Sequence, residues 1–120
     1  MAGGVGSRFW PLSTQKNPKQ FQDILGTGES LLQLTYKRVR KIIAPENILV
    51  VTNTEYVDLV YQHLPELPKQ NVLAEPMRRN TAPCIAYAAF RIKKVCATAS
   101  MIITPSDHLI TDEETYIKTL

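Results

Sequence analysis

Three short apolar runs alternate with segments of helical periodicity, and this alternation limits the folds that are open to the chain. The runs cover residues 48–52 (ILVVT), 71–75 (NVLAE) and 100–104 (SMIIT). The first run is continuous and rich in β-branched residues, as expected of a strand that is buried on both faces. Since strands that alternate with helices favour a parallel sheet covered by helices on both sides, the sequence predicts an α/β fold.

The segments around these runs predict four helices, over residues 30–43, 54–64, 81–96 and 112–120. Ser30 is a suitable N-cap for the first helix, and acidic residues at the start of the last helix suit its N-terminus. The third helix has an apolar stripe made of Ile85, Ala89, Ile92 and Cys96. This helix would separate Cys84 from Cys96 by about 18 Å, too far for a disulfide, so we expect both cysteines to be buried small hydrophobes.

The composition suits one soluble domain, because the chain has 120 residues of which 44% are hydrophobic. No run approaches the roughly 18 apolar residues of a membrane helix and no signal peptide opens the chain, so we predict a cytoplasmic protein without a membrane partner. The net charge is +3, and the longest basic run covers residues 37–41. Because no aromatic residues interleave this run, we expect a solvated helix face and no nucleic-acid partner.

The segments with chemical character all follow a predicted strand, at 3–19, 75–83 and 105–108. In open α/β sheets ligands bind beyond the carboxyl ends of the strands, so these segments mark a candidate cleft. A glycine-rich turn in such a fold follows a strand, yet only Met1 and Ala2 precede Gly3, and the chain stops inside a predicted helix. We therefore interpret residues 1–120 as the N-terminal part of a longer nucleotide-binding domain, truncated at both ends, whose central strand is mostly absent.

The first motif is glycine-rich and suits a phosphate group; it contains Gly3, Gly4, Gly6, Ser7 and Arg8. Glycines let successive backbone N–H groups form an anion nest, Arg8 adds a planar donor fork, and Lys19 adds a point charge. Taken alone, the glycines suit a sharp turn equally well. No Walker lysine is present, and the dinucleotide pattern would need a third glycine where Phe9 stands.

The second motif runs from Glu75 to Thr81 and suits a guanine base. A carboxylate at Glu75 can accept hydrogen bonds from both guanine N1–H and the 2-amino group, whereas adenine presents an acceptor at N1. A site built on such bonds can reject the wrong base by about 10⁴-fold. Asn80 is also a good N-cap for the helix that follows, and this structural role does not compete with binding.

The third motif is Pro105-Ser106-Asp107-His108, directly after the third apolar run. An aspartate at the carboxyl end of a strand is well placed to hold Mg²⁺ against phosphates. We expect a supporting role for His108. His63 lies on a predicted helix with no partner motif, so we expect it to be structural.

Together the strings AGGVGSRFWPLS…NPKQF, EPMRRNTAP and PSDH resemble the nucleoside-diphosphate-sugar pyrophosphorylases, and specifically their guanylyltransferase branch. The resemblance spans the chain from Gly3 to about Leu120. It implies a Rossmann-like three-layer sandwich with a mostly parallel sheet, of the nucleotide-diphospho-sugar transferase type. The implied reaction transfers GMP from GTP to mannose-1-phosphate and gives GDP-mannose and pyrophosphate, with Mg²⁺ as the cofactor.

The resemblance also implies roles for single residues. The glycine loop would hold the triphosphate, Arg8 would steady the leaving pyrophosphate, and Lys19 would contact the α-phosphate region. The residues implied around the base are Glu75, Asn80 and Thr81, and Asp107 is implied as the metal ligand.

Two alternatives stay open: a nucleotidyltransferase for another base or sugar, and a non-enzymatic nucleotide-binding domain. In the family the sugar site and a second metal carboxylate lie downstream of this chain, so we expect the isolated chain to be inactive. Both a monomer and a homo-oligomer are compatible with the sequence.

Overall fold

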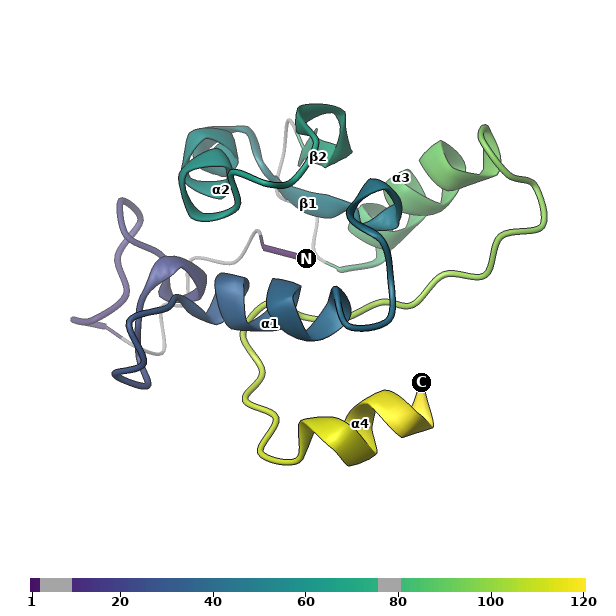
Figure 1. Ribbon diagram of the computed structural model, residues 1–120. Coiled ribbons are helices and arrows are strands. Elements are labelled where there is room, and N and C mark those ends of the chain that lie inside the picture. Colours follow the sequence, from purple (N-terminus) through teal and green to yellow (C-terminus); the bar gives the residue numbers. More distant parts are fainter. Residues whose placement is uncertain (3–9, 76–80) are drawn as a thin grey trace.

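The computed structural model describes residues 1–2, 10–75 and 81–120 (Figure 1). Two strands, β1 (Val50–Asn53) and β2 (Val72–Glu75), pair in parallel, and Val50 lies opposite Val72 in their register. The helices of the described part are α1 (Leu31–Val39), α2 (Val57–His63), α3 (Thr81–Lys93) and α4 (Glu113–Thr119). Short 3-10 turns join them, and one of these, η2 (Lys19–Phe21), carries a predicted site residue.

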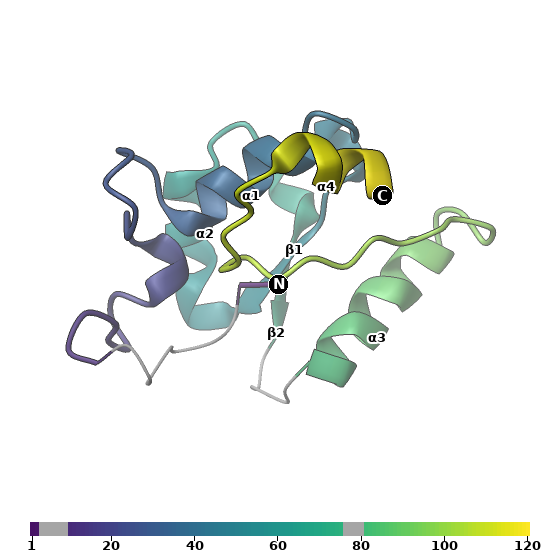
Figure 2. The same ribbon diagram turned by 90° about the horizontal axis from the view of Figure 1, so that it is seen from below.

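The chain start extends the sheet beyond β1. Ala2 N donates to Val51 O at 2.8 Å, Met1 N donates to Thr104 O at 3.1 Å, and Ser106 N donates to Met1 O at 3.2 Å. Met1 therefore lies between β1 and the segment around residue 105, and Figure 2 shows the N-terminus at this junction. Residues 1–2 thus lie beside β1, as expected of the end of a strand before Gly3, and the central strand itself stays a prediction.

The prediction of a third strand over residues 100–104 is wrong, because this run forms no strand. It crosses the molecule as an extended stretch between α3 and α4 (Figure 1). A strand is defined by its pairing with a neighbour, and among the described residues the backbone bonds to this run come from Met1, at its Thr104 end. The other strands differ from prediction only at their boundaries.

The sheet is covered on both faces, since successive strand residues point to opposite sides. Val50 and Val72 face α1 and α2 and belong to the larger buried cluster, together with Phe21, Tyr36, Tyr56 and Val60. Val51 and Leu73 face α3 and pack with Cys84 and Ala88. Figure 2 shows α1 and α4 on one side of the strands and α3 on the other, which confirms the predicted three-layer α/β arrangement.

Helix α1 begins as predicted at Ser30, whose side chain forms a capping box with Gln33. It buries Leu32 and Tyr36 and ends at Val39, four residues before the predicted end, where the chain enters a turn. Helix α4 packs near α1 through Glu113, which accepts from Arg38 Nε at 3.1 Å and Lys41 Nζ at 2.6 Å.

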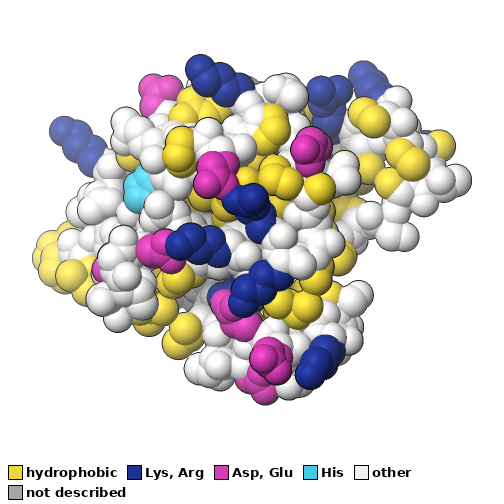
Figure 3. All heavy atoms as spheres, viewed as in Figure 1, with side chains coloured by type: hydrophobic (Ala, Val, Ile, Leu, Met, Phe, Trp, Pro, Cys, Tyr) yellow, Lys and Arg dark blue, Asp and Glu magenta, His cyan; other side chains and the backbone are white. Residues whose placement is uncertain are grey.

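The prediction of a solvated helix face over residues 37–41 is wrong for Arg38, which is buried. Its guanidinium lies over the Tyr116 ring as well as beside Glu113. Lys37 pairs with Glu29 and Arg40 pairs with Glu66. Figure 3 accordingly shows positive and negative side chains interleaved on this face, without a continuous basic patch.

The two cysteines differ from each other. Cys84 is buried as predicted, whereas Cys96 is exposed, beyond the end of α3, and both are free thiols. Within the described ranges, no helix has the length and apolar character needed to cross a membrane.

Candidate active site

Lys19 and Asp107 meet at the centre of the candidate site. Lys19 Nζ lies 2.8 Å from Asp107 Oδ2, and neither side chain is fully exposed. Lys19 comes from the turn η2 and Asp107 from the segment after the third apolar run, so the two residues are far apart in the sequence. The structure thus brings together the residue predicted to contact phosphate and the residue predicted to hold the metal.

Lys19 is held in place by its neighbours in the turn. Its backbone N–H donates to Oγ of the buried Ser13 at 3.0 Å. The buried Gln20 side chain donates from Nε2 to Ala2 O at 2.9 Å. Phe21 packs edge-on against Tyr56 and His63, with ring centroids 6.0 Å and 5.3 Å away. The turn is therefore anchored both to the sheet and to the core.

Asp107 is held through the preceding residue. Ser106 is buried, and both its N–H and its Oγ donate to Met1 O, at 3.2 Å and 2.6 Å. These bonds fix the segment beside the chain start, and Ala2 O in turn accepts from Thr52 Oγ1 at 2.9 Å. Residues 1–2 therefore connect the supports of Lys19, Asp107 and β1.

Glu75 ends β2 opposite Asn53, at the carboxyl edge of the sheet, by which we mean the edge where β1 and β2 end. The hydroxyl of Thr54 donates to Glu75 O at 3.1 Å and fastens this corner. Burial raises the pKa of Glu75, and the nearby amino group of Met1 opposes this rise. Glu75 thus combines a half-buried carboxylate with a fixed backbone at the place where ligands bind in such sheets.

The charges of Glu75 and Asp107 act on the same group. Burial lowers the pKa of the Met1 amino group, and interactions with Cys84, Asp107 and Glu75 act in the opposite direction. The geometry agrees, because Asp107 follows Ser106, which bonds to Met1 O, and Glu75 ends β2 beside β1, which accepts from Ala2 N. The Lys19–Asp107 pair and Glu75 therefore belong to one region of the molecule.

The remaining predicted residues are placed less centrally or lie outside the described residues. Thr81 begins α3 and is exposed, and His108 is also exposed. The predicted residues that lie outside the described ranges are Gly3, Gly4, Gly6, Ser7, Arg8 and Asn80. His63 accepts or donates a hydrogen bond with Ser30 Oγ at 2.9 Å, which fits its predicted structural role.

Sequence reasoning missed three residues that position the site: Ser13, Gln20 and Ser106. Each lies within six residues of a predicted site residue, but a serine or glutamine beside a motif carries no signal of its long-range partner. Among the residues that the structure describes, no group of three or more His, Cys, Asp or Glu side chains is arranged to hold a metal.

A parallel α/β sheet with charged side chains gathered beyond its strands is typical of proteins that bind a ligand at that place, and the comparisons give the family. The family model described as "Nucleotidyl transferase" matches residues 1–120. The chain therefore belongs to the nucleotidyl transferase family.

Several relatives carry the name mannose-1-phosphate guanylyltransferase. The protein from Salmonella montevideo is 42% identical over 122 residues, and the one from Escherichia coli is 38% identical over 118 residues. The alginate biosynthesis protein AlgA of Pseudomonas aeruginosa is 38% identical over 124 residues. These matches cover 97–100% of this chain but only 25% of each relative, so the chain spans about a quarter of their length.

A solved structure from Thermus thermophilus, described as a "mannose-1-phosphate geranyltransferase", has the same fold. It superposes with a TM-score of 0.82 and 30% sequence identity, over 98% of this chain and 34% of that one. This agreement supports the predicted fold class independently of the sequence relatives.

Proposed function

We propose that this chain is the nucleotide-binding part of an enzyme that transfers GMP from GTP to mannose-1-phosphate, giving GDP-mannose and pyrophosphate. The observation that carries the proposal is the contact between Lys19 and Asp107 at 2.8 Å, in the region of Glu75 at the carboxyl edge. The names of the relatives support the choice of base and sugar. GTP and mannose-1-phosphate are then the partners of the whole enzyme.

In the proposed reaction, a phosphate oxygen of the sugar phosphate bonds to the α-phosphorus of GTP while the bond to the pyrophosphate oxygen breaks. Such transfers need alignment and neutralisation of charge more than covalent help from the protein. Lys19 supplies a positive charge from a turn that is anchored by Ser13 and Gln20. Loss of one such positioned donor typically costs about 3–4 kcal/mol in the transition state.

Asp107 is the described residue that suits Mg²⁺ best. Mg²⁺ is commonly bound by one or two carboxylates and by substrate phosphates, and the ion pair with Lys19 supports a carboxylate that is placed to face a positive charge. A bound Mg²⁺ would add positive charge against the phosphate oxygens. Lys19 would then exchange Asp107 for a phosphate oxygen, which matches the role that the sequence predicts for it.

Glu75 is proposed to recognise the base. Its position at the end of β2 and its half-buried state support a carboxylate that accepts from the guanine edge with little competition from water. We expect Thr81 and Asn80, at the start of α3, to complete the base site. The cytoplasmic location and the oligomeric state stay predictions from the sequence.

The metal role can be tested by GTP binding with and without Mg²⁺. Asp107→Asn should remove most of the Mg²⁺-dependent gain in affinity, measured by calorimetry on the 120-residue chain. Asp112→Asn is the matched control, because Asp112 caps α4 through Thr115 and an asparagine can keep that cap. If Asp107→Asn binds GTP with an unchanged Mg²⁺ dependence, another residue holds the metal.

The reaction itself can be tested by product formation from GTP, Mg²⁺ and mannose-1-phosphate. A protein that includes this chain and the remaining length of its relatives should form GDP-mannose, whereas the 120-residue chain should bind GTP without turnover. Equal preference for GTP and other nucleotides would favour a different nucleotidyltransferase. Binding without turnover in the longer protein would favour a non-enzymatic domain.

A further inference from the structure

Asn53 is the last residue of β1, and only one end of its amide is used by the fold. It lies opposite Glu75 of β2 and is 9% exposed. Its Oδ1 accepts from the backbone N–H of Glu55 at 3.0 Å, which caps the short turn η4 (Thr54–Tyr56) before α2. Because a backbone N–H can only donate, this bond fixes the orientation of the amide, and Nδ2 is the end that is left over.

The NH₂ group of Asn53 is a buried donor that the cap does not need. Within the described ranges it forms no hydrogen bond. A cap requires an acceptor only, and serine or aspartate supplies one equally well. The neighbouring Thr52 is 0% exposed, and its hydroxyl does find a partner, since it donates to Ala2 O. A buried donor without an acceptor costs free energy, so the NH₂ group of Asn53 is suited to an acceptor that a ligand brings.

Asn53 and Glu75 face the same side of the sheet at its carboxyl edge. Val51 and Leu73 point toward α3, and side chains two residues further along each strand return to that face. The hydroxyl of Thr54 donates to Glu75 O, which ties the two strand ends together. Neighbouring strands lie about 4.8 Å apart, so the amide and the carboxylate can reach adjacent groups on one ligand.

A donor beside a carboxylate suits one order of groups on the edge of a base: an acceptor followed by two donors. Guanine has this order, with O6, then N1–H, then the 2-amino group. Adenine and cytosine begin with an amino donor, and uracil ends in a second acceptor. The pair formed by Asn53 and Glu75 therefore complements guanine along its whole edge, whereas the carboxylate alone contacts only the two donors.

We propose that Asn53 is a second specificity-determining residue of the base site, whose NH₂ group donates to O6 of guanine while Glu75 accepts from N1–H and the 2-amino group. The inference rests on the proposed function, because it uses the base edge that Glu75 is proposed to bind. It adds the 6-position to what the site distinguishes. Adenine would bring its 6-amino donor against the NH₂ group of Asn53, so the two residues reject adenine together.

The test uses two analogues that each change one group on the guanine edge. In 6-thio-GTP a sulfur, which is a weak acceptor, replaces O6, and in ITP the 2-amino group is missing while O6 is kept. Dissociation constants with Mg²⁺ are measured by calorimetry on the 120-residue chain. The wild type should bind GTP about tenfold more tightly than either analogue, as expected for one hydrogen bond.

Asn53→Ser removes the NH₂ group and keeps an oxygen for the cap of η4. This variant should bind GTP and 6-thio-GTP equally and should keep the preference for GTP over ITP. Asn47→Ser is the matched control, because Asn47 is exposed and precedes β1, at the other end of the strand. The control should keep both preferences. A wild-type preference for GTP over 6-thio-GTP in Asn53→Ser would overturn the proposal.

Asn53→Asp separates hydrogen bonding from size, because it has the shape of asparagine, keeps the cap and presents an acceptor to O6. The preference for GTP over 6-thio-GTP should disappear or reverse. If it persists at the wild-type value, the sulfur is rejected for its size and the proposal fails.

Glu75→Gln distinguishes a failure of this inference from a failure of the proposed function. It should lose most of the preference for GTP over ITP and keep the preference over 6-thio-GTP. An unchanged preference over ITP would overturn the proposed base recognition, and with it the inference that rests on it. If Glu75→Gln behaves as expected while both Asn53 variants keep the wild-type preference over 6-thio-GTP, the role of Asn53 alone is wrong.

Discussion

The two faces of the sheet differ in how completely they are covered. On the face of α1 and α2, a continuous cluster buries residues from η2, α1, β1 and α2 around Val60, which is 0% exposed. On the face of α3, the described residues form only a small cluster around Val51 and Leu73. Large apolar side chains on and after α3 stay exposed: Tyr87, Phe90, Val95, Ile102 and Ile103.

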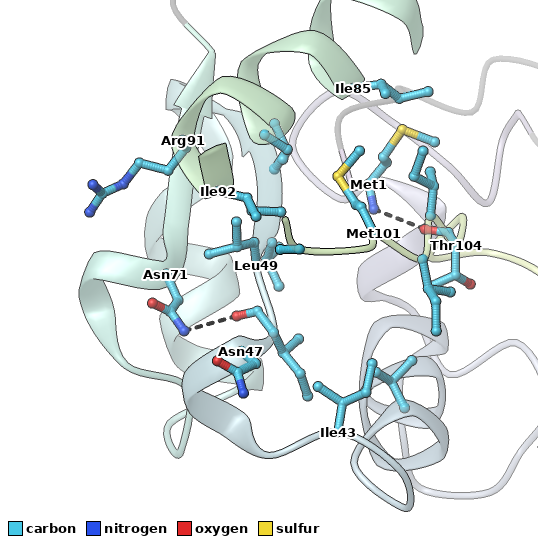
Figure 4. A pocket seen from close by; sticks show the side chains of 18 of the residues that line it. Met1, Ile43, Asn47, Leu49, Asn71, Ile85, Arg91, Ile92, Met101 and Thr104 are labelled. Atoms are coloured by element: carbon cyan, nitrogen blue, oxygen red, sulfur yellow. Dashed lines mark hydrogen bonds between the residues drawn. The ribbon is translucent and has the colours of Figure 1, made fainter. Parts of the chain in front are cut away.

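The difference teaches that an apolar pattern predicts a helix but does not by itself predict burial. Helix α1 has β1, η2 and α2 near it, so its apolar residues find partners. Helix α3 covers the other face, where an apolar pocket of about 560 Å³ lies between the helix and β1 (Figure 4). Part of the inner face of α3, including Ile92, therefore lines this pocket and, among the described residues, packs against no other side-chain layer there. Lys19 belongs to η2, whose Phe21 is part of the well-packed cluster, whereas Asp107 follows Ser106, which is bonded to the chain start, so the site joins two segments with different supports.

The largest effect should come from removing a phenylalanine on the packed face. Phe21 is 5% exposed and contacts Tyr56 and His63, so Phe21→Ala should lower the free energy of unfolding by about 3–5 kcal/mol. Phe90 on α3 is 69% exposed, so Phe90→Ala should change it by less than about 0.5 kcal/mol. Urea unfolding of both variants measures the contrast, and equal losses would remove the distinction between the faces.

A smaller effect is expected where α4 meets α1. Glu113 pairs with the buried Arg38 and with Lys41, so Glu113→Gln leaves a buried guanidinium with a weaker partner. Since Glu113 itself is partly exposed, we expect a loss of about 1–2 kcal/mol rather than the larger cost of a fully buried pair. Glu114→Gln is the control, because Glu114 is 89% exposed. Unfolding curves that coincide for the two variants would show that the pair does not hold α4.

The pH dependence of Glu113 has a defined sign. The hydrogen bond from Lys41 has the largest effect on the pKa of Glu113 and lowers it. Burial acts in the opposite direction, and the bond from Arg38 lowers the pKa again, so that it lies below its usual value of 4.5. Its contribution to stability is therefore present above pH 4.5 and lost as the pH falls through the lowered pKa. The difference in the free energy of unfolding between the wild type and Glu113→Gln should therefore shrink as the pH falls below 4.5.

The smallest effect concerns His63 on the packed face. Burial lowers the pKa of His63 below 6.5, so the unfolded chain takes up this proton more readily than the folded one. Stability from the neutral ring is thus complete above pH 6.5 and is lost as the pH falls below it. Thermal unfolding between pH 7.5 and 5.5, chosen as about one unit on either side of the usual value, should show less pH dependence in His63→Gln.

His108 provides the comparison for that experiment, because it is exposed. His108→Gln should leave the pH dependence of unfolding as in the wild type. A pH dependence that disappears in His108→Gln and persists in His63→Gln would contradict the assignment.

Much of the fold could be predicted from local pattern. The strands, the four helices and the Ser30 cap follow from periodicity and from capping chemistry, which act over a few residues. The third strand could not be predicted correctly, because pairing depends on a neighbour and, of the described residues, Met1 alone bonds to the backbone of residues 100–104. The burial of Arg38 and the exposure of Cys96 likewise depend on where α4 and the end of α3 come to lie.

The candidate site shows the same division. The motifs identified Lys19, Glu75 and Asp107 because each carries a charge with a chemical use at the end of a strand. The residues that support them could not be predicted from the sequence. Gln20 donates to Ala2 O and Ser106 donates to Met1 O, and both acceptors are distant in the sequence.

The most direct test of the account is the base preference of the nucleotide site. The dissociation constants of GTP and ATP should be measured with Mg²⁺ for the wild type and for Glu75→Gln, with Glu114→Gln as a control for lost charge on an exposed surface. Burial raises the pKa of Glu75, so its ionised form is held at a cost and the variant should unfold no more easily at pH 7. We predict a wild-type preference for GTP, up to about 10⁴-fold, that is largely lost in Glu75→Gln and kept in Glu114→Gln. An unchanged preference for GTP in Glu75→Gln would contradict the central claim that this carboxylate recognises guanine.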